Sequence, residues 1–130
     1  MYEAVTNSIK VAVEPIYIED ESDPSRHHYF WAYRVEIENQ GLDTVQLRDR
    51  FWKISDQNGK IDEVSGPGVI GEQPILQPGE TFEYTSGCPL STPSGIMMGR
   101  YTMVTEEGTS FDVEIPAFSL DIPDNRPSIN

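Results

Sequence analysis

The sequence has little cysteine, little positive charge and no long apolar run. Cys88 is the one cysteine in 130 residues, so no intramolecular disulfide can form. Nine Lys and Arg residues stand against 22 Asp and Glu residues, and the formal charge of −13 repels phosphate backbones, which argues against nucleic acid as a direct partner. No apolar run approaches the roughly 18 residues needed to span a bilayer, and the N-terminus lacks a basic, then apolar, leader. We expect a soluble, cytoplasmic protein without membrane insertion.

Helical periodicity is also lacking, because the apolar residues recur with a period of two. The strand that begins at Ile9 is expected to end near Pro15 and to continue at residues 16–18 past a bulge. In residues 44–55 the alternation of apolar residues changes phase, which predicts another bulge near Asp49. Alternation within each segment, bounded by Gly, Pro, Asn and Asp, predicts strands at residues 9–13, 28–38, 44–55, 60–65, 81–85, 96–105 and 110–117.

Two turns have clear sequence signals. Asn58-Gly59 between two strand-like runs predicts a hairpin with a type I′ turn, and Pro78-Gly79 predicts a type II turn. About seven to eight short strands with frequent turns are typical of an all-β, antiparallel β-sandwich. The paired cysteines of antibody domains are missing, so the fold is of the fibronectin type III or immunoglobulin-like kind. We expect one domain over residues 1–126 and a mobile tail over residues 127–130.

Several segments resemble the bacterial ApaG family. They are IENQG at 37–41, GPGVIGEQP at 66–74, PGE at 78–80, FEYTSG at 82–87 and TPSG at 92–95. The family commonly has Arg-His-Trp where this chain has Arg50-Phe51-Trp52. The resemblance implies a fibronectin-type sandwich and a link to cobalt resistance and magnesium efflux. Related eukaryotic domains, attached to an F-box ubiquitin-ligase subunit and to a polymerase-interacting protein, favour a binding module.

The segment at 66–71 also has the spacing G-x-G-x-x-G of dinucleotide-binding loops. Such a loop needs a following helix N-terminus, and Pro74 and Pro78 prevent a helix here. We therefore expect a tight loop that needs positive φ angles, and no bound cofactor. A nest of N–H groups remains a candidate site for an anion such as phosphate or a nucleotide. Its residues are Gly66, Gly68, Val69 and Gly71.

Metal binding and catalysis have weaker signals. His27 and His28 follow an acidic loop, but adjacent strand residues point to opposite faces, so we expect weak association with divalent cations and no specific metal site. Cys88 before Pro89 is placed in a turn and lacks the local signature of a thiol enzyme. No pair of carboxylates stands out among so many. We expect no enzymatic activity.

An aromatic segment supplies the last candidate. Alternation places Tyr29, Trp31 and Tyr33 on the core face of the strand 28–38, whereas Phe30 lies on the other face and needs a cover. Tyr29 and Phe30 are the candidate interaction surface, for an unidentified protein partner or for self-association. The leading hypothesis is a non-enzymatic interaction module, and the alternative is a small-ligand or anion-binding protein.

Overall fold

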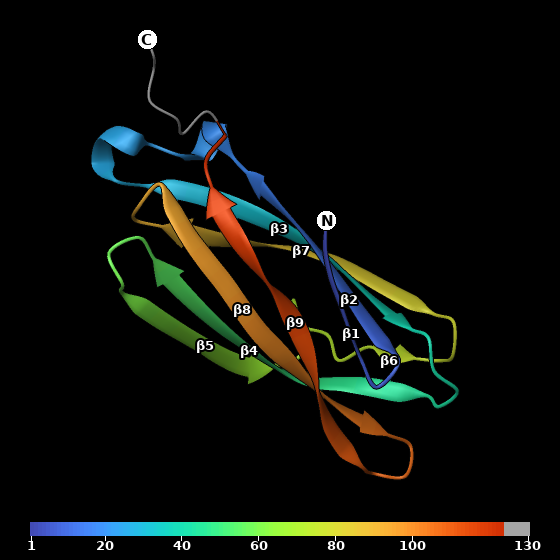
Figure 1. Ribbon diagram of the computed structural model, residues 1–130. Coiled ribbons are helices and arrows are strands. Elements are labelled where there is room, and N and C mark those ends of the chain that lie inside the picture. Colours follow the sequence, from blue (N-terminus) through green and yellow to red (C-terminus); the bar gives the residue numbers. More distant parts are fainter. Residues whose placement is uncertain (124–130) are drawn as a thin grey trace.

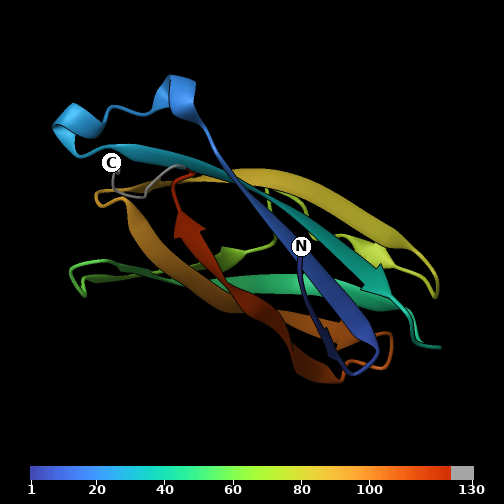
Figure 2. The same ribbon diagram turned by 45° about the horizontal axis from the view of Figure 1, so that its top comes forward.

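The computed structural model describes residues 1–123 and shows two antiparallel β-sheets packed face to face (Figures 1 and 2). The predicted β-sandwich is confirmed, while the predicted tail at 127–130 lies outside the described residues. Two short 3-10 helices, η1 (Glu19–Glu21) and η2 (Pro24–Arg26), replace the expected polar loop. The strands are β1 (Tyr2–Thr6), β2 (Ile9–Tyr17), β3 (Tyr29–Asn39), β4 (Val45–Asp56), β5 (Ile61–Pro67), β6 (Ile75–Leu76), β7 (Thr81–Leu90), β8 (Ser94–Thr105) and β9 (Ser110–Asp121).

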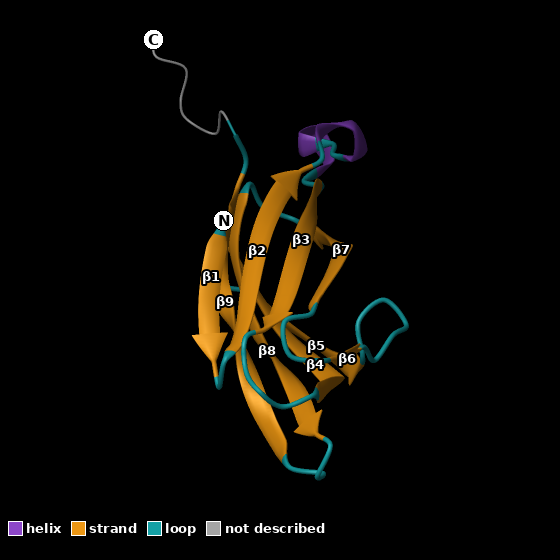
Figure 3. Ribbon diagram, turned by 90° about the vertical axis from the view of Figure 1, so that its right-hand side faces the viewer, coloured by secondary structure: helices purple, strands orange, loops and turns teal. Residues whose placement is uncertain are grey.

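The sandwich is closed along one side and open along the other. One sheet has the order β1-β2-β3-β7 and the other the order β5-β4-β8-β9, with β6 added to β4. β1 and β2 pack against β9 on the closed side, where Figure 3 shows β1 beside β9. On the open side, β7 and β5 are the last strands of their sheets within the described chain. Two unpaired edges therefore border the same opening.

The core follows the alternation predicted from the sequence. Every second residue of β3 is buried, from Tyr29 to Asn39, and the facing positions of the other strands complete one apolar cluster. The predicted bulge in β4 is confirmed by a register shift between Leu47 and Asp49. A second shift, between Met97 and Gly99, lets Pro116 sit in the β8–β9 ladder without a backbone N–H.

The N-terminal hairpin was not predicted. Asn7 and Ser8 have φ angles of 48° and 66° and turn β1 back onto β2. β1 begins at Tyr2, beside Val13, so Pro15 lies on a stretch of β2 that β1 does not reach and where no second neighbour needs its N–H. β2 therefore runs without a register shift to Tyr17, and the predicted break near Pro15 is wrong.

Two further predictions need correction. The hairpin between β4 and β5 is confirmed, but its turn is not type I′, because only Gly59 has a positive φ. The carboxylate of Asp56 accepts hydrogen bonds from the amides of Asn58 and Lys60, which favours a three-residue connection. Cys88 lies in β7, which continues to Leu90, and not in a turn. The type II turn is confirmed by Gly79, with a φ of 88°.

Candidate functional site

The glycine-rich loop closes on itself as a tight turn. Val69 and Glu72 exchange two backbone hydrogen bonds of 2.8 and 2.9 Å. Ile70 and Gly71 between them have φ angles of 43° and 81°, so the type I′ geometry occurs here. A side chain at Gly68, where φ is 64°, would collide with the carbonyl of Glu72. Gly68 and Gly71 therefore serve the fold of the loop.

Several N–H groups proposed for anion binding are already bonded. The Gly68 amide donates to the carbonyl of Arg48 at 2.7 Å, and the Val69 amide donates within the turn. The Val69 side chain is 1% exposed and belongs to the core. Gly68 and Val69 thus offer no free N–H group to a ligand.

The remaining glycine, Gly66, makes room for a charged side chain. Gly66 on β5 is the cross-strand partner of Arg50 on β4. The Arg50 guanidinium donates from Nη1 to the carbonyls of Pro67 and Gly68, at 3.1 and 2.9 Å. A Cβ at position 66 would stand 3.3 Å from Nη1. The guanidinium therefore lies across β5 in the space that a larger residue would fill.

Arg50 lies at one end of a cleft of about 520 Å³ between β5 and β7. This volume is within the range of ligand-binding pockets. Asp62 lies four residues from Gly66 along β5, roughly 13 Å away at about 3.3 Å per residue, so the cleft has a basic end and an acidic end. Between them the lining is mainly apolar, from Trp52, Ile54, Val64 and Met97, and Ser86 and Cys88 contribute from β7.

Three buried tyrosines lie close to Arg50. Burial raises the pKa of Tyr33, Tyr84 and Tyr101, while the Arg50 guanidinium lowers it by favouring the phenolate. The hydroxyls of Tyr84 and Tyr101 share a hydrogen bond, and the side chain of Ser86 lowers the pKa of Tyr33. Arg50 is thus the one cation in a cluster of neutral hydroxyls.

The cysteine is neither exposed nor activated. Burial raises the pKa of the Cys88 thiol to about 11, and Asp62 adds to this shift. Cys88 is 5% exposed and faces the core opposite Trp31. His28 is exposed, and its ring lies beside that of Phe30 on the outer face of the same sheet. The sheet therefore separates the thiol from this imidazole.

The predicted aromatic surface divides into a core residue and a surface residue. Tyr29 is 7% exposed and packs in the core, so it cannot be part of an exposed surface. Phe30 is half-buried, and its ring lies on Gly87 of β7: a Cβ at Gly87 would stand 2.5 Å from the Phe30 Cζ atom. The Phe30 ring is therefore half-buried by lying on the backbone of Gly87.

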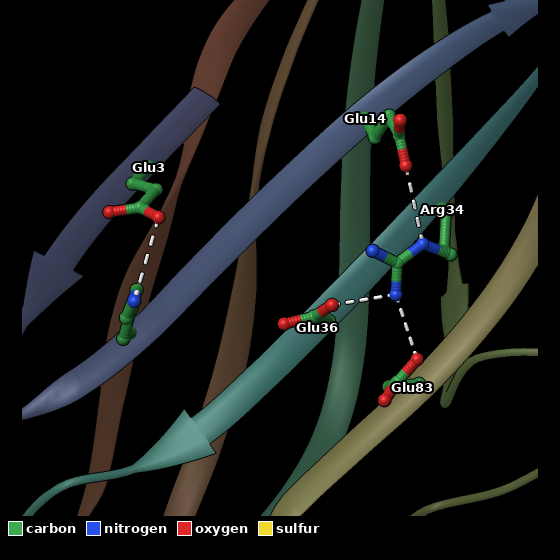
Figure 4. Close-up of polar contacts among 6 residues, drawn as sticks. Glu3, Glu14, Arg34, Glu36 and Glu83 are labelled. Carbon is green, nitrogen blue, oxygen red and sulfur yellow. Dashed lines mark hydrogen bonds and ion pairs between the residues drawn. The ribbon is translucent and has the colours of Figure 1, made fainter. Parts of the chain in front are cut away.

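Farther along this outer face, Arg34 is surrounded by carboxylates (Figure 4). Its guanidinium contacts Glu14 at 3.4 Å, Glu36 at 2.6 Å and Glu83 at 2.8 Å, from three adjacent strands. These hydrogen bonds raise the pKa of Arg34, chiefly through Glu36. The positive charge of Arg34 is already matched, unlike that of Arg50.

A second depression, of about 670 Å³, lies on the outer face of the sheet that contains β5. There the Arg100 guanidinium stacks on the Phe51 ring at 4.3 Å and pairs with Asp112 at 3.9 Å. The Arg100 guanidinium, the charged group of this depression that stacks on an aromatic ring, is thus already paired with a carboxylate of the same chain. This makes the cleft at Arg50 the stronger candidate.

The remaining sequence candidates lie apart from the cleft. His27, with φ at 57°, and His28 flank the start of β3 and are exposed. Within residues 1–123, no three His, Cys, Asp or Glu side chains are grouped to hold a metal ion. No helix in this part of the chain has the length and apolar character to cross a membrane.

Sequence reasoning missed Arg50, although a signal was present. Arg50 has the same parity as Trp52 on β4, so alternation alone places it on the face where Trp52 is buried. A charged residue in a core position is a recognised sign of a functional site. The bulge between Leu47 and Asp49 hides this signal, because it changes the phase of the alternation directly before Arg50.

Known proteins resemble this chain over its whole length. It is 57% identical over 130 residues to Protein ApaG of Brucella anthropi and 62% identical over 130 residues to that of Allorhizobium ampelinum, covering 100% of each chain. The crystal structure of the putative ApaA protein from Bordetella pertussis superimposes with a TM-score of 0.88 at 49% identity, covering 90% of this chain and 95% of the other. The ApaG domain pattern matches residues 19–105, and the chain therefore belongs to the ApaG domain family.

Proposed function

We propose that this protein is a non-enzymatic binding module that holds an extended segment of a partner protein along β5, over the cleft. The observation that carries the proposal is the free edge of β5, beside a cleft lined by apolar and charged groups. A strand at a sheet edge presents unpaired N–H and C=O groups, which an extended peptide can complete as an added strand.

β5 is a better acceptor than β7. Pro89 lies within β7 and has no N–H to donate, and Gly87 is covered on its outer side by Phe30. In β5 the proline, Pro67, is the last residue. The apolar side chains of Ile61 and Val64 are 52% and 43% exposed, so a partner would remove apolar surface from water.

The absence of an activated nucleophile supports a binding role over catalysis. A thiol with a raised pKa has little thiolate at neutral pH, and the sheet separates Cys88 from the His28 imidazole. Burial raises the pKa of Tyr33, which lines the cleft, and of Tyr84 and Tyr101 in the core near Arg50, and so favours their neutral state.

Site-specific photo-crosslinking in growing cells tests the proposal. A benzophenone amino acid at Val64 should form an adduct with a partner, and the same residue at Glu107, in the exposed turn before β9, is the matched control. The crosslinked segment, synthesised as a peptide, should shift the backbone NMR signals of residues 61–67. Adducts that are equal at both positions, or a peptide that leaves β5 unshifted, would contradict the proposal; an adduct with a second copy would identify self-association.

We also propose, on the resemblance to the family alone, that the module acts in divalent-cation homeostasis, in cobalt resistance and magnesium efflux. A strain that lacks the gene should grow less well in cobalt, and the intact chain should restore growth. Restoration by a variant that has lost peptide binding would separate this physiological role from the cleft.

A further inference from the structure

We propose that the segment bound along β5 carries, at three alternate positions, an acidic residue beside Arg50, an apolar residue beside Val64 and a basic residue beside Asp62. The inference rests on the proposed function, because it names the chemistry of the bound segment. It assigns Arg50 as the receptor of a carboxylate group.

Arg50 is a guanidinium without a carboxylate partner. No ion pair joins it to any acidic side chain of residues 1–123, although the chain has 22 acidic residues and only nine basic ones. Two carbonyls hold Nη1 in place and leave Nε and Nη2 without a partner in the described chain. A half-buried guanidinium held in one orientation, with donors to spare, is suited to a planar carboxylate.

The guanidinium also reaches the edge where a partner strand would lie. Because Gly66 has no side chain, nothing on β5 stands between Arg50 and the neighbouring position of an added strand. Directly opposed residues on adjacent strands are about 5 Å apart. Because the Arg50 guanidinium lies over Gly66, a carboxylate on the residue opposite Gly66 needs to span only this distance to reach it.

The rest of the pattern follows from the period of a strand. Gly66, Val64 and Asp62 share the cleft face of β5, so an added strand places its residues i, i+2 and i+4 opposite them. Val64 favours an apolar neighbour, and Asp62, with Glu63 beside it, favours a cation. The acidic residue comes first in an antiparallel segment and last in a parallel one.

A carboxylate fits this cleft better than phosphate does. Asp62 and Glu63 at the rim, and the net charge of −13, repel a dianion more strongly than a single negative charge. The cation expected at the far end of the segment offsets that repulsion. A carboxylate also supplies the two acceptor oxygens that match the guanidinium fork.

Selection from a random peptide library displayed on phage tests the pattern. The intact protein should enrich an acidic, an apolar and a basic residue at alternate positions. Arg50→Gln should remove the acidic preference and weaken a selected peptide by about tenfold or more, and Arg50→Lys, which keeps the charge without the fork, should weaken it less. Asp62→Asn should remove only the basic preference.

Arg48→Gln is the matched control, because it removes one positive charge from an exposed position of the same strand. It should leave both preferences unchanged, and melting temperatures should show that the variants fold. Selected peptides that shift the NMR signals of β5 and yet show no preference for an acidic residue would overturn this inference and leave the proposed function standing. An acidic preference that Arg50→Gln does not remove would do the same. No peptide bound at β5 would overturn both. Calorimetric binding of pyrophosphate that is lost in Arg50→Gln would overturn the choice of a carboxylate.

Discussion

Phe30 on β3 and Gly87 on β7 form one contact across the edge of the first sheet. The Phe30 ring lies so close to the Gly87 α-carbon that a methyl group there would stand 2.5 Å from Cζ. An aromatic ring that covers a glycine on a neighbouring strand shields backbone from water and holds the strands in register. The same contact converts an exposed aromatic into a half-buried one.

Gly87→Ala should therefore destabilise the protein by about 1–3 kcal/mol, because Phe30 must leave its position. Phe30→Ala removes the ring that collides. The double variant should thus be more stable than the sum of the two single effects predicts. Urea unfolding of the four proteins measures this coupling, and additive effects would show that the ring does not depend on Gly87.

The hydroxyl pair of Tyr84 and Tyr101 predicts an asymmetry. Tyr101→Phe leaves the Tyr84 hydroxyl buried without its acceptor or donor, and should lower the free energy of unfolding by about 1–3 kcal/mol. Replacing both tyrosines with Phe removes both polar groups and should cost less than the single change. Chemical denaturation tests this, and a double variant less stable than either single variant would contradict it.

Stability should fall in alkaline solution. Burial raises the pKa of Tyr33, Tyr84 and Tyr101 above the ordinary value of 10.0, so the folded state keeps protons that the unfolded state loses. Their contribution is complete below pH 10 and is lost as pH rises through the folded-state pKa values. The urea midpoint should decline between pH 10 and pH 12, less steeply in a Tyr84→Phe, Tyr101→Phe variant. A midpoint that stays constant over this range would refute the prediction.

Cys88 should alkylate slowly. A pKa raised from 9.0 to about 11 leaves roughly 100-fold less thiolate at pH 8, and burial restricts access further. Iodoacetamide labelling followed by mass spectrometry should show slow modification of the folded protein that accelerates towards pH 11. The urea-unfolded chain is the control, and equal rates in both states would mean that the thiol is exposed.

Arg34→Gln should lower the melting temperature at low ionic strength, because Glu14, Glu36 and Glu83 then repel one another without a cation between them. The difference from the unaltered protein should shrink in 1 M NaCl, since salt screens exposed charges. Arg26→Gln, which removes an exposed i,i+3 pair with Asp23, is the control and should change little. A salt-independent loss would point to packing and not to charge.

Local pattern was enough for much of the fold. Alternation along β3, the change of phase that marks the bulge between Leu47 and Asp49, and the Pro78-Gly79 turn all depend on neighbouring residues, and the structure agrees with each. The prediction of a type I′ turn at Asn58-Gly59 was wrong because Asn-Gly fits more than one turn geometry. The hydrogen bonds of the Asp56 side chain favour a longer connection. β1 was missed because its short, exposed alternation is weak without β2 beside it.

Sequence alone thus determined the all-β class, the faces of the strands and the family resemblance, because these follow from residue order. The tertiary structure decided which strands form the open edge, that the Phe30 ring lies on Gly87, and that Gly66 leaves room for the Arg50 guanidinium. Each of these depends on the pairing and register of residues from different strands. The register of the strands is set when the two sheets pack together, so it cannot be predicted from the glycine-rich segment alone.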